Sequence, residues 1–209
     1  MTIEMYRLRS SPTSPFVRKV LIGAEVLGLS SRIILQPVEA GNCDDPLLLQ
    51  NPLGKYPCLL RENGTPIYDS SVILEFLQMA AGSDALLPQA GEERILMLVR
   101  SRLADGIIDA GALVIYEERY HPTEHQSARW LQYQRAKIIR ALSVFEGELP
   151  CATVANVVSI GLACALGFLD RRKPVAWRDG RFPNLEHWLT TFASCQPAYG
   201  KTSPPPLLT

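Results

Sequence analysis

The amino-acid sequence predicts a mixed α/β domain followed by an all-helical domain. Segments with strand and helix character alternate through residues 1–81, whereas the periodic segments after residue 92 are helical. Residues 82–91 between these regions contain two Gly and one Pro and break both patterns, as a linker does. We therefore expect an N-terminal α/β domain at residues 1–81 and a C-terminal helical domain at residues 92–209.

The predicted N-terminal domain opens with a strand, a helix and a second strand. Residues 5–8 form a short strand candidate, and residues 32–38 are rich in apolar and β-branched side chains. Between them, Ser14 suits the N-cap of a helix, Pro15 suits its first position, and Gly28 suits its end. Such a β-α-β unit normally has parallel strands and a right-handed crossover.

A hairpin and a helix complete the predicted N-terminal domain. Residues 41–50 have the composition of a loop with at most one weak helix. Residues 57–61 and 66–68 are two short strands, and the Asn63-Gly64 pair between them is a strong hairpin signal. A helix then begins at Asp69 and Ser70 and carries apolar residues at helical spacing to residue 80.

Four helices are predicted in the C-terminal domain. The first spans residues 92–119, and Thr123 is the expected cap of a second that runs to about residue 148. A third helix is expected to start at Thr153, and Asn184 to cap a fourth that ends near residue 194. The proline run at residues 204–206 predicts an extended tail.

The charge balance excludes several classes of partner. The chain has 21 basic and 21 acidic residues, without the net positive charge that nucleic-acid binding or attraction to anionic lipid requires. The most apolar segment, residues 154–169, is too short and too rich in small residues for a membrane span. The first residues lack the features of a signal peptide. We therefore expect a cytoplasmic protein that binds neither nucleic acid nor membrane.

Cysteine and histidine placement predicts free thiols and no metal site. The cysteines lack a CxxC pair and any zinc-type spacing with histidine, which indicates a reducing compartment. His121 and His125 are four residues apart, but Pro122 lies between them and the motif is not HExxH. The five cysteines are Cys43, Cys58, Cys151, Cys164 and Cys195.

Five short motifs follow one another in a specific order and spacing. They are Ser-Pro-Phe-Val-Arg-Lys at 14–19, Asn-Pro-Leu-Gly-Lys-Tyr-Pro at 51–57, Asp-Ser at 69–70, Thr-Val-Ala-Asn at 153–156 and Phe-Pro-Asn-Leu-Glu-His-Trp at 182–188. Over nearly its whole length the chain resembles the cytosolic glutathione transferase superfamily, in particular bacterial members whose first helix starts with Ser-Pro-Phe. The resemblance implies a thioredoxin-like N-terminal domain, a C-terminal helical bundle, glutathione as co-substrate, and a homodimer.

The resemblance implies that a serine hydroxyl stabilises the glutathione thiolate. A helix start offers free N–H groups and a positive dipole end, which together with a hydroxyl lower a thiol pKa from about 8.5 toward 7. Ser14 is the preferred catalytic residue because it lies in the Ser-Pro-Phe motif. Ser11 is the alternative, since Ser10-Ser11 resembles the double serine of other classes, and Thr13 is a third choice.

The other implied glutathione-binding residues are Lys55, Tyr56, Pro57, Asp69 and Ser70. A cis Tyr56-Pro57 bond is expected from the resemblance, with the backbone of Tyr56 pairing with the cysteinyl part of glutathione as an added strand does. Ser70, at a helix start, would hold the γ-glutamyl carboxylate, and Asp69 would face its ammonium. Lys55 would meet a carboxylate. Each of these residues also has a purely structural explanation. Tyr56-Pro57 can be an X-Pro bond at the entry to a strand, Lys55 a solvated lysine, and Asp69-Ser70 a helix cap.

Two features depart from the family pattern. Asp69 stands where the family more often has Glu, which shortens the side chain by one methylene. The loop at residues 41–46 is acidic, with Asp44 and Asp45, where many relatives have a basic residue for the glycyl carboxylate. The acidic loop predicts weaker glutathione binding or a different hold on the glycine end.

The leading functional interpretation is a glutathione S-transferase of the detoxification type that conjugates small hydrophobic electrophiles or reduces peroxides. A glutathione-dependent thiol reductase is a weaker alternative, because it needs a cysteine at the helix start where this chain has Ser14. A non-enzymatic alternative is a binding protein of the stringent-starvation type, which acts through a protein partner. Retention of Ser14, Tyr56-Pro57 and Asp69-Ser70 together favours the transferase.

Overall fold

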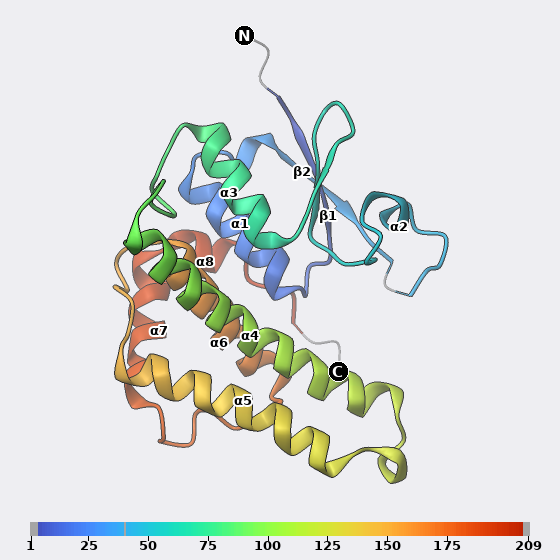
Figure 1. The fold of residues 1–209 in the computed structure, drawn as a ribbon, viewed down its shortest axis with the longest axis vertical. Helices are drawn as coiled ribbons and strands as arrows, with labels where there is room; N and C mark the ends of the chain where they lie inside the picture. Colours follow the sequence, from blue (N-terminus) through green and yellow to red (C-terminus); the bar gives the residue numbers. More distant parts are fainter. Residues whose placement is uncertain (1–3, 40, 207–209) are drawn as a thin grey trace. The chain divides into compact units, whose positions relative to one another are not determined.

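The computed structural model describes residues 4–39 and 41–206, which form two compact units. The first unit contains the chain up to Gln89 together with the segment from Pro197, and the second spans Ala90–Gln196 (Figure 1). This grouping differs from the predicted division, which placed all residues after residue 92 in the helical domain. Each unit is described separately below.

A four-stranded sheet in the order β2-β1-β3-β4 forms the centre of the first unit. The strands are β1 (Tyr6–Ser10), β2 (Ile33–Pro37), β3 (Cys58–Leu60) and β4 (Pro66–Ile67). β1 is parallel to β2, whereas β3 is antiparallel to both β1 and β4. The observed order confirms the predicted β-α-β unit and the hairpin at Asn63-Gly64.

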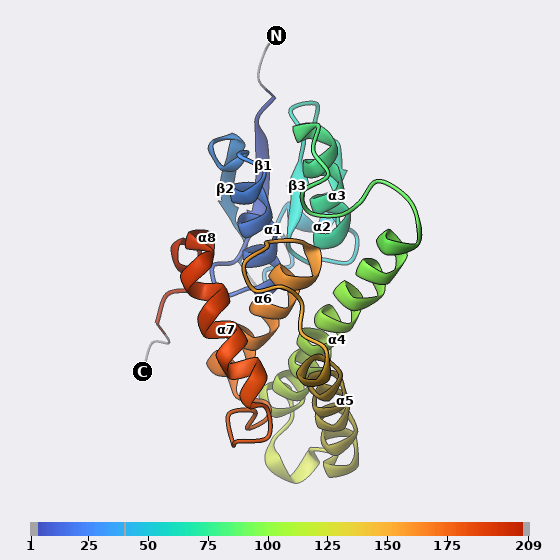
Figure 2. The same ribbon diagram turned by 90° about the vertical axis from the view of Figure 1, so that its left-hand side faces the viewer.

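The two faces of the sheet are covered by different helices. α1 (Pro15–Val26) and α3 (Ser70–Ala81) lie side by side on one face, as Figures 1 and 2 show. Leu8 and Leu59 point from the sheet into this core. Cys58 and Leu60 point to the other face, where they contact Leu47 of the short helix α2 (Leu47–Gln50). Alternation along β3 therefore assigns each residue to one of two cores.

A short C-terminal helix, α8 (Pro197–Lys201), belongs to the first unit and was absent from the sequence prediction. Arg18 of α1 donates a hydrogen bond to the C=O of Tyr199 at 2.6 Å, and its guanidinium lies 3.8 Å from the centre of the Tyr199 ring. The same guanidinium is 3.4 Å from Thr202 Oγ1. Because a five-residue helix is too short to show a helical period, only these long-range contacts reveal it.

Four long helices build the second unit. They are α4 (Glu92–Tyr120), α5 (Ala128–Gly147), α6 (Val157–Arg172) and α7 (Pro183–Cys195), with a 3₁₀ turn at Thr123–His125. The central helix α6 is mostly buried, and α4 packs against both α5 and α6. Gly111 of α4 permits this approach, since a Cβ there would lie 2.6 Å from the Phe168 ring of α6. The predicted number of helices is thus confirmed for these residues.

The predicted starts of α5 and α6 are wrong, because in each case a residue a few positions later in the chain caps the helix. Thr123 begins the 3₁₀ turn, and Ser127 is the cap of α5, accepting a hydrogen bond from the Trp130 N–H at 3.3 Å. Asn156, rather than Thr153, caps α6. Its Oδ1 accepts the N–H of Ser159 at 3.1 Å, and Ser159 Oγ accepts the N–H of Asn156 at 2.9 Å. This reciprocal pair is a capping box, and it lies three residues after the predicted helix start at Thr153.

The predicted cap of the last long helix is also wrong. Asn184 lies inside α7, directly after Pro183 at its first position. The carboxylate of Glu146, from α5, accepts the N–H groups of Asn184 and Leu185, each at 2.9 Å. A side chain from another helix therefore satisfies the first turn of α7, which no local motif can predict.

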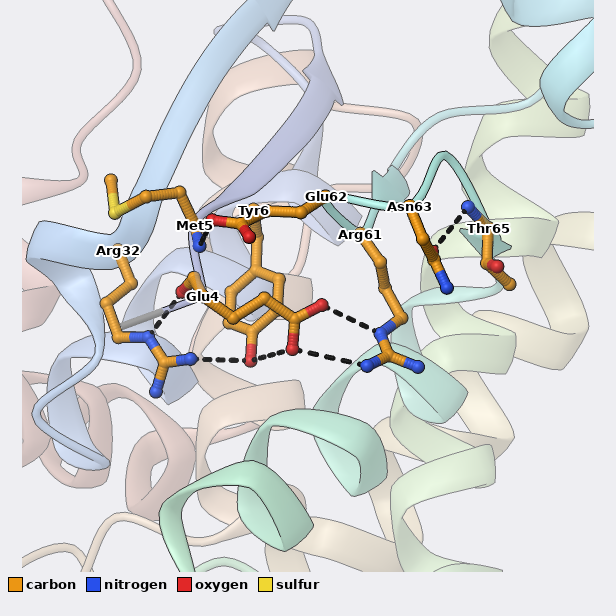
Figure 3. Close-up of polar contacts among 8 residues, drawn as sticks. All are labelled: Glu4, Met5, Tyr6, Arg32, Arg61, Glu62, Asn63 and Thr65. Carbon is orange, nitrogen blue, oxygen red and sulfur yellow. Dashed lines mark hydrogen bonds and ion pairs between the residues drawn. The ribbon is translucent and has the colours of Figure 1, made fainter. Parts of the chain in front are cut away.

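A polar cluster ties the strands together at the end of the sheet where β1 begins (Figure 3). The carboxylate of Glu4 accepts hydrogen bonds from Arg61 Nε at 2.9 Å and from the Tyr6 hydroxyl at 3.4 Å. Arg32 donates to the Glu4 C=O at 2.7 Å and to the Tyr6 hydroxyl at 2.8 Å. Arg32 precedes β2 and Arg61 follows β3, so the cluster joins three strands.

Acid sensitivity follows from this cluster. The hydrogen bond from Arg61 holds the pKa of Glu4 below its usual value. A carboxyl with a lowered folded-state pKa stabilises the fold above its unfolded pKa, about 4.3 for Glu, and this contribution is lost as the pH falls through the folded value. We expect the unfolding temperature of Glu4→Gln to fall less than that of the wild type between neutral and acidic pH. Equal acid dependence in both proteins would contradict this role.

The capping box of α6 provides a test in the second unit. Asn156→Ala removes the acceptor for two N–H groups and should lower the free energy of unfolding by about 1 kcal/mol. Asn156→Asp keeps the acceptor and adds a negative charge at the positive helix end, so its stability should equal or exceed that of the wild type. Urea unfolding followed by circular dichroism measures both. A similar loss in the two variants would show that the cap is not the cause.

Candidate functional site

The strand register brings three loops to one edge of the sheet. Arg9 pairs with Cys58 and Leu59 pairs with Ile67, with β3 antiparallel to both neighbours. The segment after β1, the segment before β3 and the segment after β4 therefore meet at this edge, opposite the Glu4 cluster. The sequence-predicted residues lie on these three segments: Ser11, Ser14, Lys55, Tyr56, Pro57, Asp69 and Ser70.

Ser14 lies at the N-cap of α1. Its Oγ accepts a hydrogen bond from the Val17 N–H at 3.2 Å, and its own N–H donates to the C=O of Ser11 at 3.1 Å. Accepting this bond leaves the hydroxyl proton of Ser14 able to donate. Ser11 Oγ lies 3.4 Å from Thr13 Oγ1, so the two hydroxyls before the helix pair with each other. Of the three, Ser14 combines a hydroxyl with the helix start.

Asn51 shapes the turn that leads to Tyr56 and Pro57. It is almost fully buried; its Nδ2 donates to the C=O of Lys55 at 2.7 Å, and its Oδ1 accepts the N–H of Leu53 at 3.1 Å. The Tyr56-Pro57 peptide bond is cis, as the resemblance implied. Asn51 begins the motif at residues 51–57, but its bracing role was not predicted; the local signal for this role is the Asn-Pro-Leu-Gly turn.

The third segment of the site, which follows β4, contains the start of α3. The carboxylate of Asp69 caps this helix and accepts the N–H of Ser71 at 2.9 Å, while Ser70 is buried at 3% exposure. The Tyr68-Asp69 peptide bond is also cis. Lys19 of α1, which has no exposed surface, donates a hydrogen bond from Nζ to Ser71 Oγ at 3.0 Å. The second turn of α1 and the start of α3 are thereby connected through a partly buried polar contact.

The acidic loop before α2 has one carboxylate directed inward. Asp45 is buried, forms an ion pair with Arg9 of β1, and accepts the N–H groups of Leu47 at 2.8 Å and Glu39 at 3.2 Å. The N–H of Leu47, followed by that of Glu39 and by Arg9, holds the Asp45 pKa below its usual value. Asp45 is therefore a structural anion neutralised by Arg9, and Asp44 is the exposed carboxylate of the pair.

Cys58, directly after Pro57, is poorly suited to be a reactive thiol. It is fully buried, and this burial raises its pKa to about 11. At neutral pH the group is a neutral thiol, and the thiolate is the nucleophilic form. This geometry counts against the thiol-reductase alternative.

Within the described residues, 4–39 and 41–206, there is neither a candidate metal centre nor a helix suited to span a membrane. No group of three or more His, Cys, Asp or Glu side chains in this part of the chain is arranged to hold a metal ion. None of the helices described there combines the length and the apolar character needed to cross a membrane.

Comparison with known proteins gives a consistent result. The family model for the glutathione S-transferase N-terminal domain matches residues 13–80. The uncharacterized GST-like protein YibF of Escherichia coli K12 is 36% identical, over 95% of this chain and 98% of its own. The match therefore extends through both units.

Solved structures are similar over the same length. A glutathione transferase family member from Pseudomonas fluorescens Pf-5, with bound glutathione, has 38% identity and a TM-score of 0.90, covering 96% of this chain and 99% of its own. A glutathione S-transferase from Methylobacterium radiotolerans, in complex with glutathione sulfonate, has 30% identity and a TM-score of 0.86, covering 98% and 97%. These similarities confirm the predicted thioredoxin-like N-terminal region followed by helices.

The Arg9–Asp45 pair can be tested by comparing two neighbouring acidic residues. Asp45→Ala would leave the buried guanidinium of Arg9 without its carboxylate, and we expect a clear fall in unfolding temperature and faster proteolysis of the loop before α2. Asp44→Ala, in the same loop but exposed, should leave both unchanged. Differential scanning fluorimetry and limited digestion with proteinase K, which needs no basic residue at the cleavage site, measure the difference. Equal behaviour of the two variants would refute the structural role of Asp45.

Proposed function

The chain belongs to the glutathione transferase superfamily, and from this premise we propose that it is a glutathione S-transferase acting on small hydrophobic electrophiles. The observation that carries the proposal is the meeting of three segments at one sheet edge: the start of α1, the turn before β3 and the start of α3. Relatives 38% and 30% identical to this chain are described with glutathione and glutathione sulfonate bound.

In the proposed mechanism, Ser14 donates its hydroxyl hydrogen bond to the glutathione sulfur. The positive end of α1 and this donor together favour the thiolate over the thiol. The thiol proton goes to solvent. The thiolate then forms a bond from sulfur to the electrophilic carbon of the second substrate, while the bond from that carbon to its leaving group breaks and the leaving group departs with the electron pair. Ser14 itself forms no covalent bond, so its helix-capping bond with Val17 persists throughout.

The peptide part of glutathione would be held by the other two segments. We assign the γ-glutamyl carboxylate to the hydroxyl and the N–H of Ser70 at the start of α3, where an anion is favoured. The cysteinyl backbone pairs with the backbone of Tyr56, next to Pro57. Lys55 is exposed beside this turn and supplies a cation for a carboxylate of the tripeptide. Asp69 shares its carboxylate between the helix cap and the γ-glutamyl ammonium.

The wider setting of the proposal follows the family. We expect a homodimer in the cytoplasm that uses glutathione as co-substrate and conjugates electrophiles or reduces peroxides in detoxification. The glutathione-bound relatives count against the alternative of a non-catalytic binding protein of the stringent-starvation type.

Glutathione titration of three serine variants tests the proposal. Loss of a hydrogen bond to a charged group removes about 1.5–3 kcal/mol, equivalent to roughly one to two pKa units. Ser14→Ala should therefore raise the pKa of the bound thiol by about one to two units. A titration of the thiolate absorbance against pH measures this shift. Ser70→Ala should weaken glutathione binding about tenfold or more in calorimetry, with the thiol pKa unchanged.

Ser11→Ala is the matched control for the thiolate assignment. If Ser14 is the donor, Ser11→Ala keeps the wild-type pKa of the bound thiol. A raised pKa in Ser11→Ala together with a normal pKa in Ser14→Ala would transfer the catalytic role to Ser11. Failure of the wild-type protein to bind millimolar glutathione would refute the transferase proposal.

A further inference from the structure

Lys19 is a buried cation that the proposed mechanism does not use. It lies in the second turn of α1, five residues after Ser14, and its side chain has no exposed surface. An ammonium group removed from water is costly unless polar partners surround it. Ser71 Oγ, at 3.0 Å from Nζ, is one of these partners. The burial of the Lys19 ammonium group therefore calls for an explanation in its surroundings.

Ser71 places this cation at the start of α3. The hydroxyl of Ser71 accepts from Lys19, while its N–H donates to the carboxylate of Asp69 at 2.9 Å. Ser71 is thus fixed at two points, and Ser70 lies between it and Asp69 in the chain. The hydrogen bond from the Ser71 N–H to Asp69 holds the peptide unit between Ser70 and Ser71, so the backbone that carries the Ser70 side chain is fixed on its C-terminal side.

The electrostatics of this position favour an anion. The N-terminus of a helix carries a partial positive charge, and a cation placed there is unfavourable unless negative charge is close. The carboxylate of Asp69 supplies one negative charge at this point. A bound carboxylate would supply a second one, so the energetic cost of burying Lys19 decreases when an anion occupies the start of α3.

We propose that Lys19 is a positioning residue of the glutathione site, which holds the first turn of α3 through Ser71 so that Ser70 can bind the γ-glutamyl carboxylate. This inference rests on the proposed function and adds a residue to it that touches no substrate atom. It also assigns a dual role to α1, whose N-cap Ser14 faces the sulfur in the proposed mechanism and whose second turn supports the carboxylate end of the same ligand.

The experiment is calorimetric titration of glutathione into Lys19→Met, Ser71→Ala, Ser71→Thr and the double variant Lys19→Met/Ser71→Ala. Lys19→Met and Ser71→Ala should each raise the Kd for glutathione about tenfold. The double variant should bind no more weakly than either single variant, because both substitutions break one contact. Ser71→Thr keeps the hydroxyl and should retain nearly the wild-type Kd.

Arg18→Met provides the matched control for a merely structural effect. Arg18 is the neighbouring buried cation of the same helix, but its contacts are with Tyr199 and Thr202. Arg18→Met should lower the unfolding temperature while leaving the Kd for glutathione within about twofold of wild type. Lys19→Met should change the Kd itself, and if that variant does not fold, Ser71→Ala alone decides.

The outcomes separate this inference from the proposed function. If the wild type binds glutathione and Ser70→Ala weakens binding, but Ser71→Ala and Lys19→Met keep the wild-type Kd, the positioning role of Lys19 is refuted and the transferase proposal stands. An equal rise in Kd for Arg18→Met and Lys19→Met would also refute it, because general destabilisation of α1 would then explain both. Absence of binding by the wild type would refute the two proposals together.

Discussion

The opposed direction of β3 relative to β1 and β4 is the constraint on which the candidate site depends. Because β3 runs antiparallel to its two neighbours, the chain leaves β1, enters β3 and leaves β4 at the same edge of the sheet. A slip of one residue in this register would exchange the two faces of β3 and separate Leu59 from the α1–α3 core. The apolar side chains of the sheet thus determine where the polar residues of the loops meet.

Buried cations secure this edge from both faces of the sheet. On the α2 face, Arg9 pairs with Asp45 and so holds the loop that precedes the Asn51 turn. On the face covered by α1 and α3, Lys19 contacts Ser71. Lys19 lies in the same motif, residues 14–19, as Ser14, so this motif contains both a residue of the proposed site and part of its support.

The sequence predicts those features that depend on neighbouring residues. The cap at Ser14, the Asn63-Gly64 hairpin and the start of α3 are local, and each is observed. The missed features depend on distant partners: Glu146 caps α7, Arg18 holds α8, and Arg9 neutralises Asp45. For each of these side chains the sequence contains several possible partners of suitable type, and it does not indicate which one the fold brings into contact. Ser14, Asp69 and Ser70 were therefore predictable as helix starts, whereas the supporting contacts made by distant partners were not.

The proposed site is composed mostly of groups that the fold already requires. Ser14 and Asp69 cap their helices whether or not a ligand is present, and Asn51 satisfies a turn. A ligand with a thiol and a carboxylate at suitable spacing would use the hydrogen-bonding capacity that remains: the hydroxyl proton of Ser14, and the hydroxyl and N–H of Ser70 at the start of α3. In this arrangement the helix start and its dipole would attract the carboxylate of the ligand. The shorter side chain of Asp at position 69 would then affect only the contact with the γ-glutamyl ammonium.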